Sequence, residues 1–412
     1  MRVLVVHNRY RSALPSGEDR VVDQESAALA QAGCIVERFE RRSDEIGELS
    51  LAGRASLPGR VVWNPEAGRA LRRAIEGFGP DVVHVHNVYP LLSPSVLAAG
   101  RGRVPVVVTF HNYRPLCPTG EMYRDGKVCT ECVGTAPAGA VLHGCYRGSR
   151  VQSLPLAAAT VVQRHLVRAG PAAYLFLSEA QRASFAGLGL PLERCFVKPN
   201  LVHPSPHRRR PEPLIAFVGR LDEPKGIRFL IQGWDRLRSG GEEGGLRLVV
   251  AGSGPLEPEV RAWAAGRARV EVLGLLSREG CAELMATARA VVVPSVWPEP
   301  FGLVVAEAMA AGAPPIAPDH AAFPELIRDG VDGALYPSGD VEGLTRLLRR
   351  AELEPNWFEK LGKEAKSSHA RRFSPAVVVD ELLAVYRFAV EHPSSAAPAI
   401  AEPSLQGSGA CA

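Results

Sequence analysis

This 412-residue chain has no long apolar runs and little excess of charge of either sign. No stretch approaches eighteen consecutive apolar residues, so we expect no membrane-spanning helix. The 48 basic residues are balanced by 44 acidic ones, and a net charge of +4 argues against bulk nucleic-acid binding. No Gly-x-Gly-x-x-Gly follows the first apolar run, which excludes the usual dinucleotide-binding fingerprint there.

The N-terminus and one basic cluster bear on where the protein works. Residues 1–7 read as a first strand and not as a signal peptide, so we expect a cytoplasmic protein. The cluster at 207–210 contains one histidine and three arginines and could contact anionic lipid at the inner face of the membrane. The alternative for this cluster is a solvated linker.

Short apolar runs alternate with amphipathic stretches along almost the whole chain, as in parallel strands joined by helices. The chain is also too long for one ordinary core. We therefore predict an α/β protein with two doubly wound, Rossmann-like domains that face each other across a cleft. The predicted strands are 3–7, 34–39, 82–86, 106–110, 174–177 and 196–198, followed by 214–218, 246–251, 270–273, 291–294, 315–317 and 334–336.

Composition also sets the expected domain boundaries. Residues 1–198 form the N-terminal domain, and the segment 199–213, rich in proline and basic residues, is a linker. Residues 214–373 form the C-terminal domain, and a helical pattern follows at 374–392. The segment 393–412 is rich in Ala, Ser, Pro and Gly and lacks aromatic residues, so we expect a disordered tail.

The segment 298–310 places two glutamates eight positions apart around the start of a helix. Pro300 pushes the preceding Glu299 into an extended conformation, so we expect the helix to start near Phe301. Glu307 would then lie nearly two turns deeper on the same helix.

The first amides of that helix, from Phe301, Gly302 and Leu303, have no partner within the helix and would face whatever lies in front of it. Glu299 and Glu307 can accept hydrogen bonds from vicinal hydroxyl groups. A nucleotide sugar combines such hydroxyls with negative charge, so this segment predicts a nucleotide-sugar site.

Two cations follow the predicted strand 214–218. Gly219 and Arg220 end this strand, and Lys225 lies in the turn behind them. An arginine and a lysine at the carboxyl end of a strand can neutralise a diphosphate. The alternative is an ordinary surface turn in which Asp222 caps a helix.

Two glycine-containing loops lie at other strand ends. Gly17 stands where a helix begins after the first strand, and its amide could reach a phosphate. An ordinary capped helix is the alternative. Gly252 and Gly254 would let backbone approach a ligand closely, with a plain tight turn as the alternative.

His111 and Glu179 also follow predicted strands. His111 would open into the cleft, where it could hold a substrate hydroxyl or stabilise charge near the reaction centre; a structural histidine is the alternative. Glu179 is expected to cap its own helix.

Together these motifs resemble the retaining glycosyltransferases of family 4, which have the GT-B fold. The resemblance covers roughly residues 1–392 and implies that the final helix crosses back onto the N-terminal domain. The matching segments are Glu-Pro-Phe-Gly-x4-Glu at 299–307, Gly-Arg-x4-Lys at 219–225, Gly-x-Gly-Pro at 252–255, Thr-x-His at 109–111 and the glycine at 17.

The resemblance also implies roles for the individual residues. Arg220 and Lys225 would hold the donor diphosphate, with Gly17 near the phosphates. Glu307 would hold the ribose hydroxyls, and Glu299 with the nearby helix amides would hold the transferred sugar. The reaction would be a front-face displacement that retains the anomeric configuration, with no protein nucleophile and no catalytic metal or other cofactor.

Four of the eight cysteines cluster in a polar insertion at about 112–149. Cys117, Cys129, Cys132 and Cys145 have a spacing that fits a tetrahedral structural zinc site. Packed free thiols and redox chemistry are the alternatives, and a cytoplasmic setting disfavours disulfides.

The family resemblance extends into this insertion. Several bacterial family members carry a similar segment, matched here at 111–118 and 124–132. Because the insertion directly follows His111, it could border the acceptor pocket.

The sequence therefore predicts a hexosyltransferase acting on a nucleotide-sugar donor. The acceptor would be a saccharide, a lipid-linked molecule or a small molecule, in envelope polysaccharide or glycoconjugate synthesis or on a secondary metabolite. A nucleotide-sugar epimerase of the same architecture is the main alternative. A metal-dependent module that reads nucleic acid through the cysteine cluster is a second, and the near-neutral charge counts against it.

Overall fold

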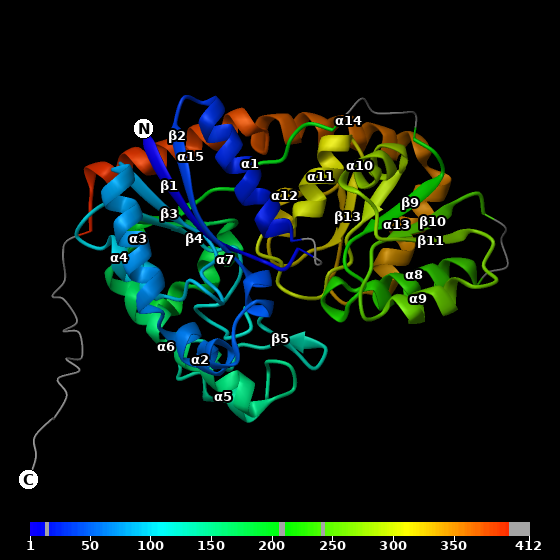
Figure 1. Cartoon of the computed structure of the whole chain (residues 1–412). Coiled ribbons are helices and arrows are strands. Elements are labelled where there is room, and N and C mark those ends of the chain that lie inside the picture. Colours follow the sequence, from blue (N-terminus) through cyan, green and yellow to red (C-terminus); the bar gives the residue numbers. More distant parts are fainter. Residues whose placement is uncertain (13–15, 206–210, 240–243, 395–412) are drawn as a thin grey trace, which may run out of the picture.

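The computed structural model describes residues 1–12, 16–205, 211–239 and 244–394. Within these residues the chain forms two α/β lobes, each built on a six-stranded parallel sheet (Figure 1). The basic cluster at 207–210 and the segment from 395 on, including Cys411, lie outside the described residues. In the part that is described, no helix has both the length and the apolar character needed to cross a bilayer.

The N-terminal sheet has the strand order β2-β1-β3-β4-β7-β8, and every neighbouring pair is parallel. The inner strands β1, β3, β4 and β7 are buried and mainly apolar because helices cover both faces of the sheet, whereas the edge strand β2 is charged and partly exposed. Leu4 and Val6 enter one core cluster, whereas Val3 and Val5 enter the other. The strands are β1 (Arg2–Arg9), β2 (Ile35–Arg42), β3 (Val82–Val85), β4 (Val106–Thr109), β7 (Ala173–Phe176) and β8 (Cys195–Val197).

Seven α-helices belong to the described part of this lobe. They are α1 (Gly17–Gln31), α2 (Leu51–Val62), α3 (Pro65–Phe78), α4 (Ser95–Gly100), α5 (Ala138–Leu142), α6 (Arg150–Ala169) and α7 (Glu179–Ser184). Short 3-10 turns lie at η1 (Ser43–Gly47), η2 (Ala186–Leu188) and η3 (Leu192–Arg194). The insertion contributes α5 and a small antiparallel hairpin of β5 (Tyr123–Arg124) and β6 (Lys127–Val128).

The C-terminal sheet has the strand order β11-β10-β9-β12-β13-β14, again parallel throughout. The order reverses between β9 and β12, and the carboxyl ends of strands at such a switch point form a crevice where ligands bind. The strands are β9 (Leu214–Val218), β10 (Arg247–Ala251), β11 (Val270–Gly274), β12 (Ala290–Val292), β13 (Pro315–Pro318) and β14 (Ala334–Tyr336).

Helices again flank this sheet. The described part of the lobe contains η4 (Glu223–Lys225), α8 (Ile227–Arg238), α9 (Glu257–Ala264), α10 (Arg278–Thr287), α11 (Leu303–Ala311), α12 (Phe323–Leu326), α13 (Val341–Leu353) and α14 (Pro355–Arg372). The predicted two-lobed α/β architecture is therefore confirmed, and all twelve predicted strands are present with ends that shift by at most three residues.

The last described helix, α15 (Pro375–Glu391), crosses back to the first lobe. Figure 1 shows α14 and α15 in orange to red along the top of the molecule, running from the C-terminal to the N-terminal lobe. Val378, Leu382 and Tyr386 are buried against the N-terminal sheet in the same cluster as Val3. The predicted crossing helix is confirmed.

Hydrogen bonds also join the lobes at the start of α7. The Ser178 hydroxyl donates to the Pro300 carbonyl at 2.7 Å, and the Glu179 amide donates to the Glu325 carboxylate at 2.7 Å. The prediction that Glu179 caps α7 is wrong, because the cap is Ser178, whose hydroxyl accepts from the Gln181 amide at 3.1 Å. The first amides of α7, which have no partner within the helix, therefore bind a carboxylate of the opposite lobe.

Candidate active site

The acidic segment begins its helix later than the sequence predicts. Helix α11 starts at Leu303, because Gly302 adopts φ 92° and acts as the N-cap. A Cβ at Gly302 would come within 2.9 Å of the Phe323 ring, so both the backbone angle and the space favour glycine. Phe301 lies just outside the helix and is buried edge-on against Phe373, with 5.7 Å between ring centroids.

The start of α11 keeps free hydrogen-bond donors. Among the described residues, the amides of Phe301, Gly302 and Leu303 donate to no other group. Such amides, together with the helix dipole, favour an anion or a polarised oxygen in front of them. The three amides are therefore free, as predicted, while the Phe301 side chain faces the core. Their role in binding the donor stays a prediction.

Glu299 lies at this helix start and is 7% exposed. Its carboxylate forms an ion pair with Lys225 and accepts a hydrogen bond from the Ser295 hydroxyl at 2.8 Å. Burial alone would raise the pKa of Glu299, but the charge and hydrogen bond of Lys225 outweigh it and hold the pKa below its usual value. Glu299 is therefore ionised, and the Lys225 ammonium also lies 5.2 Å from the centre of the Trp297 ring.

The second predicted cation, Arg220, is more exposed. Its guanidinium forms an ion pair with Asp222 while its side chain remains 69% exposed. Asp222 also accepts from the Lys225 amide at 3.2 Å and caps η4, so the capping alternative for Asp222 is realised. One carboxylate thereby positions both cations at the carboxyl end of β9.

Gly252 and Gly254, in the loop after β10, allow close contact with the loop after β9. A Cβ at Gly252 would lie 1.8 Å from the Gly219 carbonyl oxygen, and one at Gly254 would lie 2.5 Å from the Leu221 carbonyl oxygen. The Leu221 amide donates to the Ser253 carbonyl at 2.9 Å. Gly252 and Gly254 therefore let two neighbouring loops approach each other closely, and the predicted approach to a ligand stays a prediction.

The start of α1 in the N-terminal lobe lies opposite the start of α11. A Cβ at Gly17 would lie 3.4 Å from Cδ2 of Leu303, so the starts of α1 and α11 face each other across the cleft. One turn further, Arg20 forms an ion pair with Glu307. Burial raises the pKa of Glu307 despite the opposing charge of Arg20. Arg20 belongs to none of the sequence motifs and was not among the predicted site residues.

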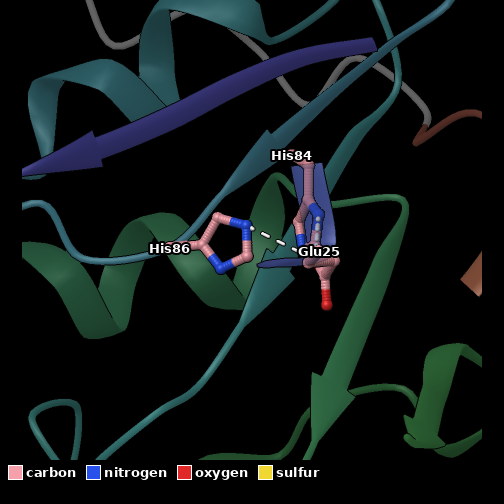
Figure 2. Close-up of side chains that lie close together, drawn as sticks. All are labelled: Glu25, His84 and His86. Atoms are coloured by element: carbon pink, nitrogen blue, oxygen red, sulfur yellow. Dashed lines mark ion pairs between the residues drawn. The ribbon is translucent and has the colours of Figure 1, made fainter. Parts of the chain in front are cut away.

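His111 lies behind this entrance and contacts a second histidine. Its Nε2 is 2.8 Å from Nδ1 of His86, and the two rings stack with centroids 5.1 Å apart. Nε2 of His86 in turn lies 3.7 Å from a carboxylate oxygen of Glu25. Figure 2 shows Glu25 of α1 close to His86 and to His84 of β3.

Glu25 is the centre of a buried polar network that the sequence analysis did not predict. Lys198 Nζ lies 2.5 Å from one carboxylate oxygen, and Nδ1 of His84 lies 3.4 Å from the other. His84 also contacts the Tyr386 hydroxyl and the Thr109 hydroxyl, each at 2.7 Å. The network therefore links the N-terminal sheet, α1 and the crossing helix α15.

Burial keeps these histidines neutral. It lowers the pKa of His84 to about 4 and holds the pKa of His86 and of His111 well below the usual value. Neutral rings beside the single pair of Glu25 and Lys198 leave the network without excess charge.

The atoms of Glu25, His84 and His86 lie within 4.8 Å of one another, close enough in principle for a metal ion. Lys198 already neutralises the carboxylate, however, and both ring nitrogens of His84 already contact hydroxyl groups. The donor set therefore fits a hydrogen-bonded network better than a metal centre.

A cavity of about 20 Å³ opens beside His111 and His86. It is also lined by Glu18, Arg114 and Gln163. Among the described groups, Glu18 Oε1 and Arg114 Nε are buried without a hydrogen-bond partner. These two atoms offer an acceptor and a donor to a polar group that enters the cavity.

The four cysteines of the insertion lie together around a second cavity, of about 60 Å³. Cys117, Cys129, Cys132 and Cys145 all line it. Within the described residues, no three of their sulfur atoms lie within 4.8 Å of one another. The thiols thus share one cavity without already forming a tight ligand cage.

Each lobe of the chain matches a known family of glycosyltransferase domains. Residues 5–200 match the family model "Glycosyl transferase 4-like domain", and residues 212–351 match "Glycosyl transferases group 1". The two matches fall on the N-terminal and C-terminal lobes and together span most of the chain. Each lobe therefore matches a glycosyltransferase domain, and the pair supports a glycosyltransferase with the GT-B fold.

Individual relatives carry several activities. The chain is 26% identical to alpha-D-kanosaminyltransferase of Streptomyces kanamyceticus over 84% of this chain and 86% of the relative. It is 34% identical to phosphatidyl-myo-inositol mannosyltransferase of Mycobacterium leprae, but the alignment covers only 42% of this chain and 46% of that protein. The chain thus spans about half the length of some curated relatives it matches.

Solved structures share the fold at low sequence identity. Anabaena Alr3699/HepE in complex with UDP and glucose superposes with a TM-score of 0.64 and 17% identity, over 94% of this chain and 99% of that one. Sucrose-phosphate synthase from Thermosynechococcus elongatus gives a TM-score of 0.66 and 20% identity, over 94% and 98% of the two chains. These likenesses support the GT-B fold of this chain.

Proposed function

We propose that this protein transfers a hexosyl group from a nucleotide-sugar donor to an acceptor hydroxyl with retention of the anomeric configuration. The observation that carries the proposal is the meeting of the two helix starts across the cleft, Gly17 of α1 against Leu303 of α11. Cations and carboxylates from both lobes flank this point. A negatively charged diphosphate joined to two sugars matches that combination.

Each group has a role in this reaction. Lys225, Arg220 and the free amides of α11 stabilise charge that develops on the leaving diphosphate, and a single such donor is typically worth about 10²–10³ in rate. Glu299 orients the transferred sugar, and Glu307 accepts hydrogen bonds from the ribose hydroxyls. The chemistry is front-face displacement, in which the leaving phosphate helps to deprotonate the acceptor.

The acceptor enters from the N-terminal lobe in this proposal. The cavity beside His111 offers the unpartnered atoms of Glu18 and Arg114 to acceptor hydroxyls. His111, kept neutral by burial, can accept or donate one hydrogen bond at the reacting centre.

The wider setting is part of the same proposal. The acceptor is a saccharide, a lipid-linked molecule or a small molecule, in envelope polysaccharide or glycoconjugate synthesis or on a secondary metabolite. The protein works in the cytoplasm, with peripheral contact at the inner face of the membrane, and needs no catalytic metal. The named relatives are glycosyltransferases and give the epimerase alternative no support.

Incubation with a panel of UDP-, GDP- and ADP-sugars and a mixture of acceptors tests the proposal. We expect release of nucleoside diphosphate that depends on the acceptor, and a product whose anomeric configuration, read by NMR, equals that of the donor. An inverted product would overturn the retaining mechanism. Interconversion of donor sugars without transfer would identify an epimerase instead.

A further inference from the structure

We propose that the four cysteines of the insertion bind a structural zinc ion. This inference is independent of the glycosyl-transfer proposal, because it rests on a different region of the N-terminal lobe. Cys117, Cys129, Cys132 and Cys145 line one cavity, and four thiolates are a common ligand set for structural zinc.

The thiols reach the cavity from three separate segments. Cys117 follows β4 in a turn where its amide donates to the Tyr113 carbonyl at 2.8 Å. Cys129 and Cys132, with two residues between them, follow β6, and Cys145 follows α5. The backbone therefore brings distant parts of the insertion to one point before any side chain is considered.

The surroundings suit an anionic centre. A zinc ion with four thiolates carries excess negative charge, which neighbouring cations compensate. Arg124 lines the same cavity as the four thiols. The buried Arg164 donates to the carbonyls of Leu116 and Cys132 at 2.9 and 2.6 Å and so fixes the backbone beside two of the ligands.

The insertion contains little regular secondary structure. Its regular structure consists of two-residue strands β5 and β6 and the five-residue helix α5. Isolated hairpins and helices of this length are marginal in water. A metal cross-link stabilises small segments of this kind.

Zinc binding requires a local side-chain movement. Tetrahedral zinc holds sulfur at about 2.3 Å, which places sulfur atoms about 3.8 Å apart. Because no three thiols of the described chain lie within 4.8 Å of one another, the side chains must turn toward the cavity they line. The Cys117 Sγ now contacts the Thr119 hydroxyl at 3.2 Å, and a zinc-bound thiolate can accept a hydrogen bond from that hydroxyl.

The proposed zinc site lies next to the part of the insertion that borders the cleft. Glu121 and Tyr123 line the same cavity and also lie within the electrostatic reach of Asp222 on the opposite lobe. Zinc would thus stiffen the part of the insertion that borders the predicted donor cations. Metal loss should leave both sheets folded and change this border first.

Elemental analysis of the full chain, purified without metal-chelating resin, is the first test. We expect about one zinc per chain and, after exchange, the thiolate-to-metal charge-transfer absorption of cobalt bound to cysteine. Less than about a tenth of an equivalent of zinc after purification with zinc in the medium would overturn the proposal.

Variants locate the ion. Cys129→Ser with Cys132→Ser should abolish zinc binding, whereas Cys34→Ser, a control outside the insertion, should retain it. Retention of full zinc by the double variant would overturn the proposal. Should the double variant fail to fold, Cys145→Ser decides: it should lose the four-thiolate cobalt spectrum, and an unchanged spectrum counts against the site.

Thiol counting separates zinc from disulfides. In denaturant with a chelator and no reductant, all eight cysteines should react with a thiol reagent. A shortfall of four thiols that reductant restores would indicate two disulfides and overturn the zinc assignment. Limited proteolysis gives a further readout, since chelation should produce new cuts within 112–149.

Discussion

The two walls of the cleft carry their charges in different ways. On the C-terminal wall, Lys225 and Glu307 pair with partners yet keep 28% and 23% of their side chains exposed. On the N-terminal wall, Glu25 and Lys198 pair at 3% and 1% exposure, among neutral histidines. The first set can exchange its partners for a ligand, whereas the second cannot be reached by one.

The exposed pairs are suited to binding a ligand, whereas the buried pair is suited to holding neighbouring side chains in position. Partly exposed charges at strand and helix ends suit recognition of an anionic donor, because water and ligand both reach them. A buried, fully paired network holds its members in place and transmits rigidity to His111 through His86. Substitutions should therefore affect mainly activity on one wall and mainly stability on the other.

The largest effect is expected from Lys198→Met, which leaves Glu25 buried without its cation. Breaking a buried pair costs about 3–5 kcal/mol, so the free energy of unfolding in urea should fall by that order. Adding Glu25→Gln should recover much of the loss. Arg228→Ala, which breaks an exposed pair with Glu259, is the control and should have a far smaller effect. Equal losses for both would erase the contrast between buried and exposed pairs.

Next in size is Lys225→Ala on the C-terminal wall. Loss of this cation should lower kcat/KM by about 10²–10³ while circular dichroism shows a folded protein. Adding Arg220→Ala should abolish measurable turnover. The exposed Lys363→Ala, on α14, controls for loss of a lysine. Unchanged kinetics in Lys225→Ala would remove Lys225 from the donor site.

The buried histidines predict a pH dependence of stability. Burial lowers the pKa of His84 to about 4 and that of His86 well below its usual value, whereas an unfolded histidine titrates near pH 6.5. Below pH 6.5 the unfolded chain therefore takes up protons that the folded chain does not, and stability falls toward pH 4. Each such histidine contributes about 1.4 kcal/mol per pH unit, so two should cost about 2–3 kcal/mol at pH 5.5.

Urea unfolding between pH 7.5 and 4.5 measures this slope. His84→Gln should flatten it, and His165→Gln, on the exposed side of α6, is the matched control. If both variants keep the slope of the parent protein, the network does not exclude protons as described.

The smallest effect concerns the pair that bridges both walls. Glu307→Gln should raise the donor Kd about tenfold, through loss of charged hydrogen bonds to the ribose. Arg20→Ala should act in the opposite direction by a few-fold, because it frees Glu307 from a competing partner. Calorimetric titration with the nucleotide sugar that the donor panel selects measures both. Weaker binding in Arg20→Ala would show that Arg20 contacts the donor itself.

The C-terminal wall was largely predictable from sequence because its residues stand in short continuous motifs at strand ends. Glu299, Arg220 and Lys225 therefore lie together at the carboxyl ends of the strands of the C-terminal sheet. The start of α11 was misplaced by two residues, because the left-handed Gly302 delays a helix that proline alone predicted to begin earlier.

The N-terminal network escaped prediction because its members come from scattered elements. Glu25, Lys198 and Tyr386 each lie on a different segment and meet only through the tertiary fold. One signal was available: His84 in β3 and His86 just after it stand two positions apart in an otherwise apolar run, which places both on the same face of an extended segment. Two polar residues on that face require buried partners.

Arg20 and Glu307 already neutralise each other, as do Lys225 with Glu299 and Arg220 with Asp222. A donor that enters must therefore trade places with side chains that hold one another, and only the difference between the old and new contacts appears as affinity. When these ion pairs form again, they compete with the bound nucleoside diphosphate for the same side chains. The protein's own ion pairs would therefore favour release of the product.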